Sequence, residues 1–137
     1  MSVDGIVGVE QWQLPPDATA PAHARRLLEG ALSAWSDPSD AVLIASELVA
    51  NMVRHGEDPF TLGAAVVDTC RAGRQVRLTA TNVSRSPTAS PHVVQAEAGA
   101  LNGRGLAMVA ALSEEWGWTQ TDGLTIVWVV VSGTAQT

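Results

Sequence analysis

Residues 47–56 read ELVANMVRHG, and this stretch says more about the fold than any other part of the chain. Its apolar residues recur at the three- and four-residue spacing of an amphipathic helix, so one side can face a core. Glu47 and Asn51 are four residues apart and project from one face, which Arg54 continues by another turn. A carboxylate, a carboxamide and a cation therefore form a polar ridge. The ridge is either a solvated face or part of a binding site.

A second motif, NGRGL at residues 102–106, runs directly into an apolar-periodic segment that predicts a helix over 103–112. Glycines let the backbone approach a ligand closely, and the free N–H groups at a helix N-terminus favour phosphate. A tight turn explains a Gly-x-Gly sequence before a helix equally well. The combination of this loop with the polar ridge favours a phosphate site.

Together the two motifs resemble the histidine-kinase-like ATPase (GHKL) superfamily, and among its members the small bacterial anti-sigma-factor serine kinases. Residues 46–56 resemble the N box of that family, and residues 103–106 resemble its second glycine box. The resemblance implies an α/β two-layer sandwich: a mixed, mostly antiparallel sheet with helices on one face. It implies one domain over residues 1–137, with a core at about 7–131 and ATP between the helices and a lid.

The periodicity of the chain predicts elements in an order that favours such a sandwich. The expected elements begin with a strand at 7–14 and a helix capped by Thr19, whose inward stripe is Ala24, Leu27, Leu28, Ala31, Leu32 and Trp35. A helix at about 38–55, ended by Gly56, follows, and then a hairpin of strands at 60–67 and 75–82 with Val76, Leu78 and Ala80 facing the core. The rest is a lid at about 83–102, the helix at 103–112, an extended segment from Trp116, a turn at Asp122-Gly123 and a central strand at 125–131.

Composition narrows the class of protein. A length of 137 residues with 46% hydrophobic content suffices for one domain with a core. The net charge of −6 argues against a nucleic-acid surface and against an anionic membrane surface. Cys70 is the single cysteine, so no internal disulfide can form and a reducing cytoplasm is expected. No leader pattern and no membrane-spanning apolar run is expected from the sequence.

The polar ridge supplies the expected metal and catalytic groups. The side-chain oxygen of Asn51 suits Mg²⁺, a hard ion that also takes phosphate oxygens and water, and the resemblance assigns Asn51 this part. The resemblance assigns Glu47 the role of activating a hydroxyl or a water as general base. Arg54 either neutralises phosphate charge, holds the lid or remains a solvated cation. His55 fits a capping or packing residue, and no catalytic role is expected for it.

The resemblance implies that the loop before the later helix wraps the phosphates. Gly103 and Gly105 would let the backbone approach them. Arg104 either contacts a phosphate or points to solvent. Leu106 is most simply a core residue close to the adenine.

Asn82 is where the chain departs from the family pattern. The family carries an Asp there that accepts a hydrogen bond from the adenine amine, and Ser84 matches the Ser or Gly two residues later. An amide still accepts through its oxygen but also offers an NH₂ donor. Replacing a charge-assisted bond by a neutral one costs roughly 1–2 kcal/mol, or about ten- to thirtyfold in affinity. An amide that offers donor and acceptor together also loosens the purine preference.

Two functions are consistent with these residues. The first is a cytoplasmic regulator that binds Mg-ATP, phosphorylates Ser or Thr of a small antagonist protein and holds a sigma factor; a dimer is compatible with it. The second is a non-catalytic module on the same fold, in which Asn82 marks a weakened pocket and the protein acts by partner exchange or heterodimerisation. The sequence leaves the choice between an enzyme and a binding module open.

Overall fold

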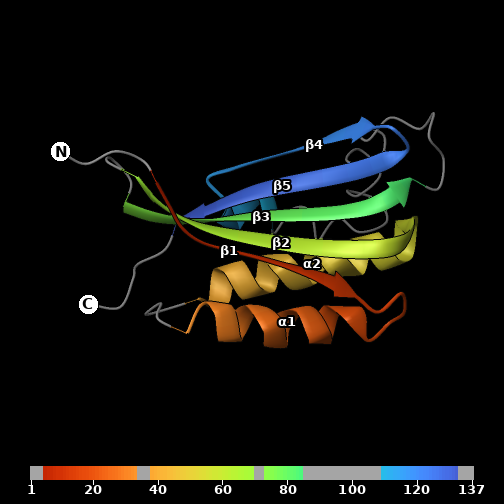
Figure 1. Cartoon of the computed structure of the whole chain (residues 1–137), viewed down its shortest axis with the longest axis horizontal. Coiled ribbons are helices and arrows are strands. Elements are labelled where there is room, and N and C mark those ends of the chain that lie inside the picture. Colours follow the sequence, from red (N-terminus) through yellow and green to blue (C-terminus); the bar gives the residue numbers. More distant parts are fainter. Residues whose placement is uncertain (1–4, 34–37, 70–72, 85–108, 133–137) are drawn as a thin grey trace.

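In the computed structural model, the described residues are 5–33, 38–69, 73–84 and 109–132 (Figure 1). They form, in chain order, β1 (Gly5–Leu14), α1 (Ala20–Ala31), α2 (Ser39–His55), β2 (Gly56–Thr69), β3 (Gly73–Ser84), β4 (Glu115–Thr121) and β5 (Leu124–Ser132). Residues 109–112 are also helical. The predicted elements are therefore found wherever the described ranges cover them.

The strands form one five-stranded sheet in the order β1-β2-β3-β5-β4. Every neighbouring pair in this sheet is antiparallel. Both α1 and α2 lie on the same face of the sheet (Figure 1), which confirms the predicted two-layer α/β sandwich. The last strand, predicted to be central, is paired on both sides by β3 and β4 but lies one place from the edge, and the central strand is β3.

Helix α2 contacts α1 on one side and β2, β3 and β5 of the sheet on another. Asp40 lies in its first turn, and Arg54 and His55 lie in its last turn, an arrangement that complements the helix dipole. Its buried residues recur every three or four positions, as an inward stripe requires: Ala41, Val42, Ile44, Ala45, Ser46, Leu48, Val49 and Met52. The predicted helix over 38–55 is confirmed, with the helix proper starting at Ser39.

The start of α1 differs in detail from the expectation. Thr19 occupies the N-cap position with φ −81° and ψ −12°, a helical conformation in which its side chain caps no backbone N–H. Its hydroxyl and its backbone N–H instead both donate to Asp17 Oδ1, the latter at 2.8 Å. The hydrogen bond from the Thr19 hydroxyl, and then that from its N–H, hold the pKa of Asp17 below its ordinary value. Most of the predicted stripe is confirmed, since Ala24, Leu28 and Leu32 are fully buried, but Ala31 is exposed. Trp35 lies outside the described residues.

The two hairpins follow their sequence patterns closely. In β3, Val76, Leu78 and Ala80 are buried in the core whereas Arg77 is exposed, as the alternation predicts. The hairpin of β2 and β3 is longer than predicted, because β2 begins at Gly56 and β3 runs on to Ser84. The chain between β4 and β5 turns at Asp122 and Gly123, with φ of 52° and 77°. Positive φ at both residues is typical of a type I′ hairpin turn and of Asp-Gly sequences.

From the position of the core, we expect two substitutions to have clearly different effects on the free energy of unfolding. Leu78 has 0% of its side chain exposed, so Leu78→Ala should lower the free energy of unfolding by about 2–5 kcal/mol through lost burial and a cavity. Val9 on β1 is 62% exposed, so Val9→Ala should change it by no more than about 0.5 kcal/mol. Urea unfolding followed by circular dichroism measures both, and equal midpoint shifts would contradict this placement of the core.

Candidate functional site

The helix-facing side of the sheet changes from apolar to polar toward one end. Three cross-strand rows show the change, from the middle of the sheet outward: Leu78–Val129–Trp116, then Ala80–Val127–Trp118, then Asn82–Thr125–Gln120. The first two rows contribute to the core or pack beside it, whereas the third consists of two amides and a hydroxyl. A polar row at the edge of a core is where a ligand can find hydrogen-bonding groups against an apolar wall.

Asn82 is one of two buried polar side chains at this end. It is 7% exposed, and its Nδ2 donates a hydrogen bond of 2.7 Å to the backbone oxygen of Val83. Burying an amide is costly unless it is hydrogen-bonded, and this bond satisfies one side of the amide. The predicted base-binding residue therefore lies in the helix-facing layer, in a fixed setting.

Ser84 closes the same end of the sheet. Its side chain is 7% exposed, and its hydroxyl forms a hydrogen bond of 2.7 Å with the hydroxyl of Thr125. Its backbone N–H donates to the oxygen of Gly123 at 2.7 Å. Two hydrogen bonds thus attach the last residue of β3 to the start of β5 and to the turn before it.

Gly56 connects this polar end to α2. The helix ends at His55, as predicted, but Gly56 does not adopt the left-handed conformation that glycine often takes after a helix. It is extended, with φ −112° and ψ −176°, and starts β2 opposite Ser84. A Cβ at Gly56 would lie 2.5 Å from Cγ of Asn82 and still nearer its Nδ2. Glycine is required there because the end of α2 and the Asn82 side chain are in direct contact.

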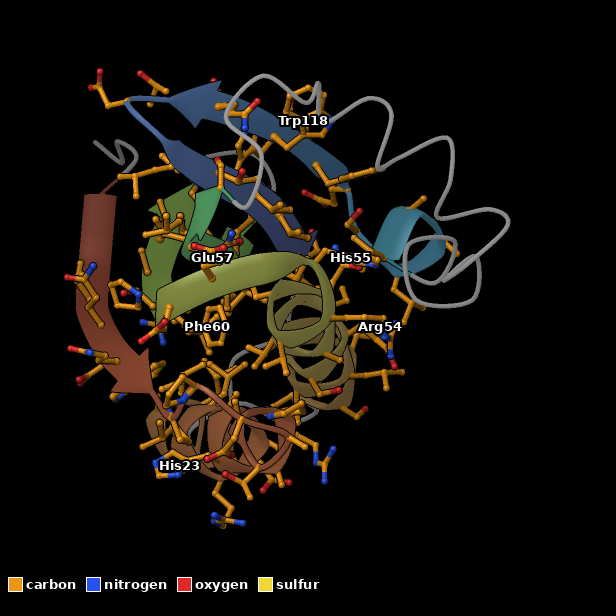
Figure 2. All side chains as sticks on the ribbon, turned by 90° about the vertical axis from the view of Figure 1, so that its right-hand side faces the viewer. His23, Arg54, His55, Glu57, Phe60 and Trp118 are labelled. Atoms are coloured by element: carbon orange, nitrogen blue, oxygen red, sulfur yellow. The ribbon has the colours of Figure 1, made fainter. Side chains whose placement is uncertain are left out.

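The polar ridge of α2 therefore approaches the polar end of the sheet at one place. Asn51 and His55 are half-buried and lie within the last five residues before Gly56, Asn51 about 7 Å before it along the axis. Glu47 is half-buried one turn earlier. Arg54 is exposed and points away from the sheet, whereas His55 lies on the side of α2 toward β5 (Figure 2). The structure thus places the end of α2 against Asn82 and leaves Arg54 exposed.

Few charged side chains surround this end within the described part of the chain. Glu57 and Asp58 are exposed at the start of β2, and Arg54 is exposed in the last turn of α2. Within the described ranges, no group of three or more His, Cys, Asp or Glu side chains that could hold a metal ion is found. A Mg²⁺ ion that keeps most of its waters and takes one or two protein ligands does not need such a group.

Several predicted residues lie outside the described residues. These are Gly103, Arg104, Gly105 and Leu106, together with residues 85–102 of the predicted lid. The prediction that the lid begins at residue 83 is wrong, because Val83 and Ser84 still belong to β3. The last turn of the predicted helix over 103–112 is helical at 109–112, where Val109 is fully buried.

Thr125, Gln120 and Trp118 were missed as members of this end. The pairing of Thr125 with Gln120 could have been predicted from the Asp122-Gly123 turn, because a two-residue hairpin loop fixes the register of its strands. The pairing of Thr125 with Asn82 joins strands that are distant in the sequence, so no local pattern indicates it.

A family model described as the histidine kinase-like ATPase domain matches residues 14–131, which is most of the chain. The chain therefore belongs to the histidine kinase-like ATPase domain family. Membership in this family supports an ATP-binding role. A search of curated proteins finds no match. None of the helices in the described ranges has the length and apolar character to cross a membrane.

The hydroxyl pair at the end of β3 predicts a measurable coupling. Thr125→Val leaves the buried Ser84 hydroxyl without this partner and should lower the free energy of unfolding by about 1–3 kcal/mol. Ser84→Ala should lower the free energy of unfolding by a similar amount, because it leaves the Thr125 hydroxyl without the same partner. The double variant should lose less than the sum of the two, by about 1 kcal/mol in a double-mutant cycle. Strictly additive losses in urea unfolding would show that the pair is not coupled.

Proposed function

We propose that this chain binds Mg-ATP between the C-terminal half of α2 and the polar end of the sheet. The observation that supports the proposal is the contact of Gly56 with Asn82, which brings the end of α2, the helix that carries Asn51, against a buried amide on β3. A row of polar side chains at the edge of an apolar core offers a base both hydrogen-bonding groups and an apolar wall. The family to which the chain belongs supports nucleotide as the ligand.

The phosphate end of this site would be formed by α2 and the glycine loop. The side-chain oxygen of Asn51 is a hard donor suited to Mg²⁺, which would bridge the chain to phosphate oxygens. The carboxylates of Glu47, Glu57 and Asp58 would disfavour a bare triphosphate at this end. A divalent cation offsets that repulsion, which is a physical reason to expect the nucleotide as its magnesium complex. Gly103 and Gly105 would supply backbone N–H groups to the phosphates.

We further propose that the protein acts as a Ser/Thr kinase on a small antagonist protein. Mg-ATP, when bound, supplies the phosphoryl group for transfer. Glu47 lies one turn before Asn51 on the same ridge, so its carboxylate would accept the proton of the attacking hydroxyl close to the metal. The same protein would hold a sigma factor or another target by an exposed face, in the cytoplasm.

Calorimetric titration with ATP and Mg²⁺ tests the binding site. The unsubstituted protein should bind with micromolar affinity, and Asn51→Ala should weaken binding at least roughly tenfold, or about 1.4 kcal/mol, because a metal ligand is lost. Gln11→Ala on β1 is the matched control, an exposed amide away from the site, and should bind as the unsubstituted protein does. No binding by the natural protein, with binding restored by Asn82→Asp, would contradict the proposal and favour the partner module.

A substitution at Glu47 tests phosphoryl transfer separately from binding. Glu47→Gln should leave the affinity for Mg-ATP within about threefold of the natural value, because the side chain keeps its size. Single-turnover transfer to the protein substrate should fall by about 10²- to 10⁴-fold, the usual contribution of a general base. Glu29→Gln, on the exposed side of α1, serves as control. Unchanged transfer in Glu47→Gln would remove Glu47 from the reaction.

A further inference from the structure

We propose that two copies of this chain associate through the outer face of the sheet, the face opposite α1 and α2 (Figure 1), about a two-fold axis that runs along β5. The surface consists of the outward-facing residues of β3, β5 and β4. It lies on the other side of the sheet from the proposed nucleotide site, so the inference goes beyond that site and does not depend on it.

The described helices all pack on the other face. Helices α1 and α2 lie together on that side (Figure 1), and the helical residues 109–112 join the same core, since Val109 belongs to it and Leu112 packs against it. On the outer face, the Trp128 side chain of β5 is 37% exposed. A single exposed apolar side chain is common on protein surfaces; the arrangement of its neighbours is what points to a partner.

Strand β5 forms an apolar stripe along the middle of this surface, and the strands on its two sides carry mostly small or polar residues. The alternation that turns Leu78 and Ala80 toward the helices turns the odd-numbered residues of β3 and their partners outward. An apolar centre with a polar rim is typical of a protein–protein interface. The outward rows are Val83–Leu124–Thr121, Thr81–Ile126–Thr119, Thr79–Trp128–Gly117 and Arg77–Val130–Glu115.

The indole of Trp128 lies flat over its neighbour on β4. A Cβ at Gly117 would lie 2.6 Å from Cζ2 and 2.9 Å from Cε2 of Trp128, so the ring occupies the space that a side chain at residue 117 would take. Because the ring lies along the sheet, the surface is level enough for a second sheet to stack on it at the usual distance of about 10 Å.

The two sides of β5 carry opposite charges at equivalent places. Arg77 on β3 and Glu115 on β4 both pair with Val130, and both are exposed. A two-fold axis along β5 exchanges the two sides, so Arg77 of each copy would meet Glu115 of the other. The same operation places Thr79 against Gly117, a larger residue against a smaller one.

This self-complementarity identifies the partner as a second copy. In an interface with two-fold symmetry, each residue meets its counterpart from the other side of the axis, and the contact occurs twice. Opposite charges at equivalent positions satisfy that condition, whereas a partner of different sequence would not require it. The Trp128 rings of the two copies would meet at the axis, where aromatic pairs prefer an offset stack.

The size of the surface predicts a weak dimer. Stacked sheets lie at roughly 30° to each other, an angle that the long side chain of Arg77 can follow. Three strands from each copy form a small interface, so the dissociation constant should be about micromolar or weaker. Because its two ion pairs lie at the rim, association should weaken further as salt is added.

Sedimentation velocity from about 1 μM to about 500 μM protein tests the inference. The natural protein should pass from monomer to dimer in this range. Arg77→Glu sets like charges opposite Glu115, and Glu115→Arg sets like charges opposite Arg77, twice in each dimer. Each variant alone should associate at least about tenfold more weakly. An equimolar mixture of the two should dimerise as the natural protein does, because both contacts between them then join opposite charges.

Arg25→Glu is the matched control, because it makes the same change of charge at an exposed position of α1. It should dimerise as the natural protein does. A variant that carries both Arg77→Glu and Glu115→Arg should also dimerise again, since the pair is only exchanged. Circular dichroism checks that each variant keeps the fold.

Three results would overturn the inference. One is a natural protein that stays monomeric over the whole range, and another is a dimer that both charge reversals leave unchanged. The third is a mixture of the two single variants that stays monomeric. Binding of Mg-ATP is measured separately by calorimetry with Asn51→Ala, so a failure of the dimer leaves the proposed function standing.

Discussion

The contact between Gly56 and the Asn82 side chain is the constraint on which the rest of the arrangement depends. A single residue ends α2, starts β2 and leaves space for a buried amide on β3. The helix passes into the strand without a loop, so the last turn of α2 is joined directly to the start of β2. Any side chain at position 56 would separate the helix end from the Asn82 amide, which is a reason for glycine that has nothing to do with a left-handed backbone.

Along β3, the helix-facing side of the sheet has an apolar half and a polar half. Toward the beginning of β3, the helix-facing side carries Val76 and Leu78, both fully buried in the core that β3 shares with α2. Toward the end of β3 the same face carries Asn82 and Ser84, whose hydrogen bonds replace apolar contacts. Groups positioned by a rigid core in this way lose little freedom when a ligand binds, which favours affinity.

Much of the fold could be predicted from local sequence, and the reasons are physical. The period of α2, the alternation of β3 and the Asp-Gly turn are each set by neighbours in the chain, so a short window contains the whole signal. Thr19 was predicted to cap α1 because threonine is common at that position. Its hydroxyl instead donates to Asp17 Oδ1. Residue propensity does not tell which of these two hydrogen bonds a threonine will make.

The site was less predictable than the fold. Asn51 and Glu47 stand out because polar residues at helical spacing are unusual on an apolar helix, and Asn82 stands out against the family pattern. The opposition of Asn82 and Thr125, and the dependence of Asn82 on Gly56, arise from strand pairing between distant segments. The orientation of an amide follows from its hydrogen bonds, which no sequence pattern carries.

A titration of the isotopically labelled protein with Mg-ATP, followed by amide chemical shifts, locates the ligand most directly. We expect the largest shifts at Asn51, His55 and Gly56 of the α2 end and at Asn82 and Ser84 of β3, with Val9 and the exposed side of α1 unaffected. Shifts centred away from the contact of Gly56 with Asn82, or none at millimolar Mg-ATP, would contradict the assignment of this end of the sheet as a nucleotide site.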